Sequence, residues 1–281
     1  MDKKKSVVFL FINGPHHVYH LILPALKYAS MNEDIETIII SGNPTNTKII
    51  NEAKILTGFN QFNLIDIPIP LRYRFKNYKK KLYPPVYTRI KKIVGILKNA
   101  AAIISTSHEL PKYLDLYQIK CPALFYLYHG TGTREYGFES KLKDFDYILA
   151  PGNYHKKRLK KTLSLTDEKI SIIGTPKSDW LKLIKDKEHN FFENDFPIFY
   201  YVPHWNKDLS SYLKWRKIIL NYFINNNQYN LIFAPHPLIK HLSKKEGYKL
   251  ETSLKDSNNI IIDHGGKNSI DGTYTAIADI Y

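Results

Sequence analysis

The sequence lacks several features by which proteins are often classified. It has one cysteine, Cys121, which excludes an intramolecular disulfide framework and suits a reducing cytoplasm. No apolar run approaches the roughly 20 residues that a membrane-spanning helix needs. The phosphate-binding motifs GxxxxGKS/T and GxGxxG and the nucleophile motif GxSxG are also missing. The sequence therefore gives no indication of a disulfide scaffold, a spanning helix, a P-loop enzyme or a serine hydrolase.

The N-terminus resembles a secretory signal only faintly. Lysines precede a short apolar run in MDKKKSVVFLFINGPHH. That run is short, and no small-residue cleavage site follows it. We therefore expect a first buried strand there, and a cytoplasmic protein.

Acidic residues are too few to balance the basic ones, and the formal net charge is +15. Such a charge favours an anionic partner, which can be a nucleic acid, a membrane surface or a phosphate-rich substrate. The stretch from Leu71 to Lys98 has no Asp or Glu, and tyrosines are interspersed among its ten basic residues. These are Arg72, Arg74, Lys76, Lys79, Lys80, Lys81, Arg89, Lys91, Lys92 and Lys98.

Basic residues mixed with aromatic ones are typical of a surface that binds an anionic bilayer. They would also suit single-stranded nucleic acid, but no nucleic-acid-binding module is visible, so we expect no nucleic acid as a partner. We predict that the protein is peripheral at the inner face of the cell membrane. The residues predicted to bind the membrane are Arg72, Arg74, Lys79, Lys80 and Lys81.

Ten short apolar runs predict strands. Most are apolar throughout rather than alternating, as in strands that are buried on both faces of a parallel sheet. They lie at 6–12, 36–41, 62–67, 101–106, 123–129, 147–151, 169–174, 198–203, 230–235 and 259–264. Helix-like segments alternate with them, which predicts an α/β fold. These segments lie at 17–30, 45–56, 86–98, 177–187, 209–223 and 237–247.

Ten strands are many for one open sheet, so we predict two Rossmann-like parallel-sheet domains that face a cleft. The N-terminal domain is expected at residues 1–165 and the second at residues 166–281. The last residues, ADIY, read as the start of one more buried strand. We therefore expect the second domain to be incomplete in this sequence.

Several predicted strands end in a loop that contains histidine. In a doubly wound sheet, ligands bind beyond the carboxyl ends of the strands. A neutral histidine exchanges a proton near pH 7, and the neighbouring glycines let the backbone approach a ligand. Any one of these histidines could be structural, but the set predicts a site for a phosphate-bearing substrate with proton transfer. The loops are 13–17, 129–131, 203–205, 235–237 and 264–266.

A metal site is the competing interpretation of the first loop. His16, His17 and His20 could ligate zinc from one helical turn. No matching carboxylate or cysteine is nearby, so we expect neither a metal nor a cofactor.

Several motifs in order resemble those of the CDP-glycerol glycerophosphotransferase family, the teichoic-acid-type polymerases and primases of GT-B fold. HGT at 129–131 resembles the family's histidine-glycine-threonine element, and IGTPKSDWL is similar to its glycine-x-proline-arginine-x-aspartate motif. IFYYVPHWN resembles a strand that ends in proline-threonine-tryptophan, and LIFAPHPLI resembles one that ends in histidine-proline. DYILAPGNYHKKRL and YTAIADIY resemble two further segments. The resemblance covers residues 120–281, and the sequence stops before the family's next donor-phosphate loop.

The resemblance implies roles for individual residues. His129 would be the general base on the acceptor hydroxyl, with Gly130 and Thr131 beside it. His236 would bind the donor pyrophosphate, together with His204 and with Lys177, which stands where arginine is usual. The loop of Gly14, His16 and His17 resembles the acceptor-side loop of sugar transferases. These residues would bind substrate.

Three hypotheses follow. The first is a transferase that moves glycerol phosphate, another polyol phosphate or a sugar from a nucleotide-activated donor to a cell-envelope polymer or lipid-linked acceptor. The donor would be CDP-glycerol or a nucleotide sugar. The second is a GT-B nucleotide-sugar glycosyltransferase or epimerase. The third is a non-catalytic, truncated remnant that binds anionic membranes.

Overall fold

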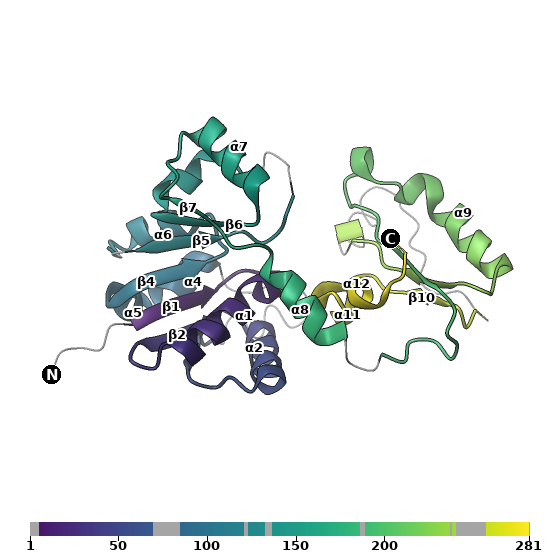
Figure 1. Ribbon diagram of the computed structural model, residues 1–281, viewed down its shortest axis with the longest axis horizontal. Helices are drawn as coiled ribbons and strands as arrows, with labels where there is room; N and C mark the ends of the chain where they lie inside the picture. Colours follow the sequence, from purple (N-terminus) through teal and green to yellow (C-terminus); the bar gives the residue numbers. More distant parts are fainter. Residues whose placement is uncertain are drawn as a thin grey trace. The chain divides into compact units, whose positions relative to one another are not determined.

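The ten predicted strands are confirmed, and they form two parallel sheets (Figure 1). The computed structural model describes residues 6–69, 85–120, 123–132, 137–185, 189–236, 238–239 and 257–280. It divides into two compact units, Met1–Asp179 and Trp180–Tyr281. Each is an α/β unit of the Rossmann type, as the buried apolar runs predict.

The first unit is built on a seven-stranded sheet in the order β3-β2-β1-β4-β5-β6-β7. All of its neighbouring strands pair in parallel. The strands are β1 (Ser6–Phe11), β2 (Glu36–Ser41), β3 (Asn63–Asp66), β4 (Ala100–Ser105), β5 (Leu124–Leu127), β6 (Tyr147–Ala150) and β7 (Ile170–Ile172).

Helices cover both faces of this sheet. One core cluster packs Val8 and Leu10 of β1 against Leu97 and Leu159 of the later helices. The alternate residues of β1 point to the other face, where the Phe9 ring lies 5.6 Å from the Tyr28 ring of α1. The helices are α1 (Pro15–Met31), α2 (Pro44–Thr57), α4 (Val86–Lys91), α5 (Val94–Lys98), α6 (Leu110–Leu116), η1 (Ser140–Asp144) and α7 (Asn153–Leu163). The helix predicted over 86–98 is thus two short helices.

The second unit has a smaller parallel sheet, in the order β10-β9-β8. Phe223 of α9 packs with Phe233 on one face, and Tyr274 of α12 packs with Ile232 on the other. Ile280 forms a parallel bridge with Phe199, which agrees with the predicted start of a strand at ADIY. The elements are β8 (Ile198–Tyr201), η2 (Lys207–Leu209), α9 (Tyr212–Asn225), β9 (Asn230–Phe233), β10 (Ile260–Ile262), α11 (Lys267–Asp271) and α12 (Thr273–Ile277).

The boundary between the units falls in α8 (Pro176–Lys185). The sequence places it between residues 165 and 166, before β7. Ile170 of β7 pairs with Ile148 of β6, so β7 belongs to the first sheet. The apolar residues of a three-residue edge strand do not indicate to which of two sheets the strand belongs. The sequence therefore assigns β7 to the second domain.

The carboxyl end of β1 is held by two buried polar side chains. Arg89 Nη1 donates to the carbonyl oxygens of Ile12 (2.8 Å) and Gly42 (3.2 Å). Asn46 Nδ2 donates to those of Phe11 and Asn13, both at 3.0 Å. These carbonyls lie where the chain leaves the sheet, and buried carbonyl groups need hydrogen-bond partners. Arg89 and Asn46 therefore fix the loop that follows β1.

The basic stretch predicted to bind membrane is described only in part. Its expected membrane-binding residues, Arg72, Arg74, Lys79, Lys80 and Lys81, lie outside the described residues. Arg89, which also belongs to the basic stretch, is only 8% exposed and serves the sheet edge. No helix in the described part of the chain is long and apolar enough to cross a bilayer.

Replacing Arg89 with leucine should destabilise the first unit by about 2–4 kcal/mol, because two buried carbonyls lose charged donors. Urea denaturation followed by circular dichroism measures the loss. The tryptophans, Trp180, Trp205 and Trp215, all lie in the second unit, so their fluorescence reports that unit separately. Lys91→Leu, an exposed change on the same helix, is the control, and an equal effect of both variants would contradict this role.

Candidate functional site

The strand order of the first unit reverses between β1 and β4. The chain builds β2 and β3 outward on one side of β1, and then β4 to β7 on the other. The crevice at such a switch point is where doubly wound sheets bind ligands. Asn13, Gly14 and the first turn of α1, which carries His16 and His17, follow β1, and residues 106–108 follow β4. His129 follows β5, the next strand, so three histidine-bearing segments meet at this edge.

His17 joins the two loops across the switch point. Its Nδ1 lies 3.0 Å from Thr106 Oγ1 and 3.4 Å from Asn13 Nδ2. An amide nitrogen only donates, so His17 Nδ1 accepts and the ring carries its proton on Nε2. The pKa of His17 is lowered to about 2, first by burial and then by the neighbouring histidines. His17 is therefore neutral at pH 7.

His129 lies against His17, with 4.1 Å between the ring centroids. Burial lowers the pKa of His129 to about 4, helped by the charges of His16 and His108 and opposed by a hydrogen bond to the Thr106 backbone. Its Nδ1 is buried and has no hydrogen-bond partner. A neutral imidazole is the form of histidine that can act as a general base on a hydroxyl group.

Three further side chains complete the histidine cluster, which we define as His16, His17, His20, His108 and His129. His16 is exposed, and its ring lies 4.3 Å from that of His17. His20 is 7% exposed and its ring lies 6.5 Å from that of His129. Burial, then the charge of Lys177, lowers the pKa of His20 to about 3. No three His, Cys, Asp or Glu side chains among the described residues are arranged to hold a metal ion.

Lys177 belongs to the first unit. The sequence groups it with His204 and His236 as a donor-phosphate ligand, but it lies in the first turn of α8, on the first unit's side of the boundary. Its charge acts on His20. Lys177 thus adds positive charge near the histidine cluster.

The glycines of the predicted site differ in what surrounds them. A Cβ on Gly130 would meet nothing within 4 Å, so the protein's own packing does not require glycine there. A Cβ on Gly14 would lie 3.2 Å from the His16 ring. Thr131 is exposed beside Gly130. The open space at Gly130 is what close approach of a ligand to the backbone needs.

His155 supports the loop after His129 and was not identified from the sequence. It is buried on α7, and its Nε2 donates to the carbonyl of Gly132 (3.3 Å). The His155 ring stacks on the Phe138 ring. The Arg158 guanidinium also packs on Phe138, 4.1 Å from the centroid of its ring. His108 was missed as well, although it follows a predicted strand, like the histidines that were found.

The second unit places His204 and His236 at the carboxyl ends of β8 and β9, with 6.1 Å between their ring centroids. The Nδ1 of His204 accepts the Asn206 N–H (3.1 Å), and that of His236 accepts the Leu238 N–H (3.2 Å). Each neutral ring therefore carries its proton on Nε2. Burial, and then His204, lowers the pKa of His236. The two Nε2–H groups thus lie at one edge of the small sheet.

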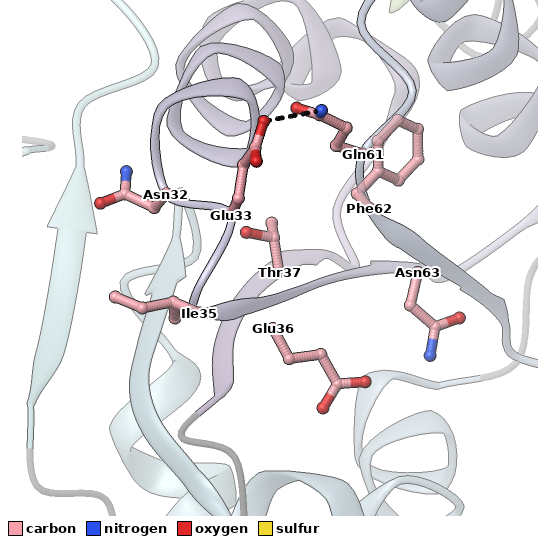
Figure 2. Close-up of a pocket in the computed structure, with 8 residues that line it drawn as sticks. All are labelled: Asn32, Glu33, Ile35, Glu36, Thr37, Gln61, Phe62 and Asn63. Atoms are coloured by element: carbon pink, nitrogen blue, oxygen red, sulfur yellow. Dashed lines mark hydrogen bonds between the residues drawn. The ribbon is translucent and has the colours of Figure 1, made fainter.

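A pocket of about 320 Å³ lies at the opposite edge of the first sheet (Figure 2). Its lining includes Glu36 and Asn63, the first residues of β2 and β3, so it is at the amino ends of the strands. Gln61 Nε2 donates to Glu33 Oε1 across it (3.1 Å). The pocket contains no member of the histidine cluster and is separate from the candidate site.

No protein-family model matches the chain, and no curated protein matches it. Several solved structures are similar to this chain. The UDP-GlcNAc 2-epimerase of Neisseria meningitidis, crystallised with UDP-GlcNAc, is similar over 98% of this chain and 76% of its own, with a TM-score of 0.61 and 11% identity. A putative UDP-N-acetylglucosamine 2-epimerase from Listeria monocytogenes is similar over 98% and 73%, with a TM-score of 0.63 and 12% identity.

The wall teichoic acid polymerase TagF is also similar. A structure of one of its histidine-to-alanine variants matches 99% of this chain and 65% of its own, with a TM-score of 0.54 and 17% identity. At such identities the similarity establishes the fold alone. The chain has the GT-B fold, as the motifs predicted.

Acid should destabilise the first unit in a way that depends on the histidine cluster. Below pH 6.5 the histidines of the unfolded chain bind protons. In the folded chain His17, His20 and His129 stay neutral, because their pKa values are about 2, 3 and 4. Stability should fall as the pH drops from about 6.5 to 5, by at most about 1.4 kcal/mol per pH unit for each histidine. Hydrogen exchange of the β1 amides measures this loss.

The His129→Gln variant should show a shallower dependence on pH than the parent. His189→Gln removes a histidine of the second unit and should leave the slope at β1 unchanged. Equal slopes in the parent and His129→Gln would contradict a neutral, buried His129.

Proposed function

We propose that this chain is an enzyme that acts on a nucleotide-activated sugar or polyol phosphate, with His129 as its base. The observation that carries the proposal is the group of neutral histidines, His17, His20 and His129, at the switch point of the first sheet. His129 and His17 are kept uncharged by burial, and their ring centroids lie 4.1 Å apart. A base of this kind suits an enzyme that activates a hydroxyl group.

Transfer to the acceptor forms one bond to the donor and breaks another. A lone pair on the acceptor oxygen attacks the electrophilic carbon or phosphorus of the donor, and the bond from that atom to the nucleotide phosphate breaks. The hydroxyl proton passes to His129, and the leaving nucleotide takes the electron pair. An anionic donor raises the proton affinity of a nearby imidazole, so a base with a low pKa in the free protein gains strength when the donor binds.

The other predicted residues have roles consistent with this step. Gly14, His16, His17, Gly130 and Thr131 line the acceptor side. His204 and His236 donate Nε2–H hydrogen bonds to the phosphates of the donor, and Lys177 supplies positive charge near His20. The chain's net charge of +15 favours such an anionic substrate.

A nucleotide-sugar glycosyltransferase or epimerase is the better supported form of this enzyme. The similarity to the two epimerases has the higher TM-scores, 0.61 and 0.63. The crystallised ligand of the Neisseria enzyme, UDP-GlcNAc, makes UDP-sugars the first donors to test.

Glycerol phosphate transfer from CDP-glycerol is the second form. It is favoured by the ordered motifs around His129 and His236 and by the similarity to TagF, which has a TM-score of 0.54. The acceptor would then be a cell-envelope polymer or a lipid-linked molecule, and the basic stretch from Leu71 to Lys98 would hold the protein at the inner face of the membrane.

The full chain should turn over one donor class, and the product identifies which. UDP-GlcNAc and CDP-glycerol are each incubated with the protein in deuterated water. Release of UDP or CMP on addition of acceptor indicates transfer, whereas deuterium at C2 of the sugar indicates 2-epimerisation, because inversion there breaks and remakes a C–H bond. His129→Asn should lower the rate by about 10²–10⁴-fold.

His189→Asn is the matched control, because it removes a histidine outside the cluster, and it should keep the parent rate. Equal rates in His129→Asn and the parent would overturn the assignment of the base. Failure to bind either donor in calorimetry would overturn the proposed function and leave a non-catalytic binding protein.

A further inference from the structure

Helix α9 of the second unit is apolar on two faces. Tyr212, Leu220 and Phe223 are buried in the core with the three-stranded sheet. A second apolar stripe, Trp215, Ile218 and Tyr222, faces solvent, with exposed fractions of 42%, 56% and 52%. These three recur at i, i+3 and i+7, so they lie on one side of the helix. A surface helix ordinarily carries polar residues there.

Two lysines lie beside this stripe. Lys214 and Lys217 are exposed, and Lys214 Nζ lies 5.3 Å from the centroid of the Trp215 ring. The helix sequence, YLKWRKIILNYFIN, contains no acidic residue. An outward face with exposed aromatic and aliphatic side chains, cations and no carboxylate has the composition of a helix that lies in a membrane interface.

Three more large apolar side chains are exposed in this region. Leu209, Leu213 and Ile224 are 61%, 44% and 43% exposed. Leu209 lies in the short helix η2 just before α9, and the other two are in α9. Helices η2 and α9 therefore expose six large apolar side chains, more than a surface helix with a single apolar face carries.

We infer that the outward face of α9 docks on the surface of an anionic lipid bilayer, with Trp215, Ile218 and Tyr222 at the level of the headgroups. Charge complementarity selects this occupant. A symmetric contact with a second copy would bring Lys214 and Lys217 of both chains together, which like charges disfavour. Lipid phosphates instead pair with these lysines while the apolar stripe enters the interface.

The test measures binding of the full chain to sedimented vesicles of phosphatidylcholine, with and without about one third phosphatidylglycerol. Binding should require the anionic lipid and weaken as salt is added. Replacing Lys214 and Lys217 together with glutamine should lower the partition coefficient by about thirtyfold. Replacing Trp215, Ile218 and Tyr222 together with serine should lower it at least about tenfold.

Helix α2 supplies matched controls, because it also has 14 residues and lies in the first unit. It carries the exposed residues Lys48, Lys54 and Ile55, the last of them 81% exposed. Lys48→Gln with Lys54→Gln, and Ile55→Ser, should bind vesicles like the parent. All variants should keep the parent's circular dichroism spectrum. The replacement of Lys214 and Lys217 changes only exposed side chains, so its effect on vesicle binding cannot come from unfolding.

Tryptophan fluorescence gives a second readout at the proposed contact. Trp180 is 3% exposed, so in a Trp205→Phe background Trp215 is the exposed tryptophan of the chain. Its emission should shift to the blue with anionic vesicles and be quenched by brominated lipid.

Three results would overturn the inference. They are no binding to anionic vesicles, binding that the α9 variants leave unchanged, and α9 variants that change the oligomeric state in place of vesicle binding. Vesicle binding needs neither donor nor acceptor, so this inference and the proposed function can each fail without the other.

Discussion

The parallel pairing of β1 with β2 on one side and β4 on the other is the constraint on which the first unit depends. All six residues of β1 are buried, and their register brings the carboxyl ends of both neighbours level with its own. That arrangement delivers His17 and Thr106 to one place although 89 positions separate them in the chain. Arg89 and Asn46 hold the carbonyls at the same edge, so the loop that carries His16 and His17 has a fixed departure from the sheet.

Burial then sets the chemistry of the histidine cluster. Five imidazoles close together would repel one another if they were charged, and desolvation already disfavours the charged form. His17, His20 and His129 are therefore neutral in the free protein. A phosphate-bearing ligand would bring the negative charge that the cluster lacks. Lys177 adds a fixed positive charge nearby, which further favours the neutral state of His20.

The sequence predicts the strands well because each buried parallel strand is a continuous apolar run, which needs no knowledge of its neighbours. It also predicts that His129 and His16 stand at strand ends. It cannot predict which strand ends are neighbours, because strand order depends on tertiary pairing, so the bond between His17 and Thr106 was not foreseen. The role of Arg89 cannot be predicted for the same reason: nothing in a basic stretch marks one of its basic residues as buried, and only the fold shows that Arg89 is.

The account depends most on His17, His20 and His129 being neutral at the switch point of the first unit, and NMR tests this most directly. The chain has 11 histidines, whose ring Cε1–H signals can be labelled and assigned by single replacements. In the full chain without ligand, His17, His20 and His129 should keep the chemical shifts of neutral rings from about pH 7 down to about pH 5, since their pKa values lie near 2, 3 and 4. Titration of His129 near its ordinary value of 6.5 would contradict the claim.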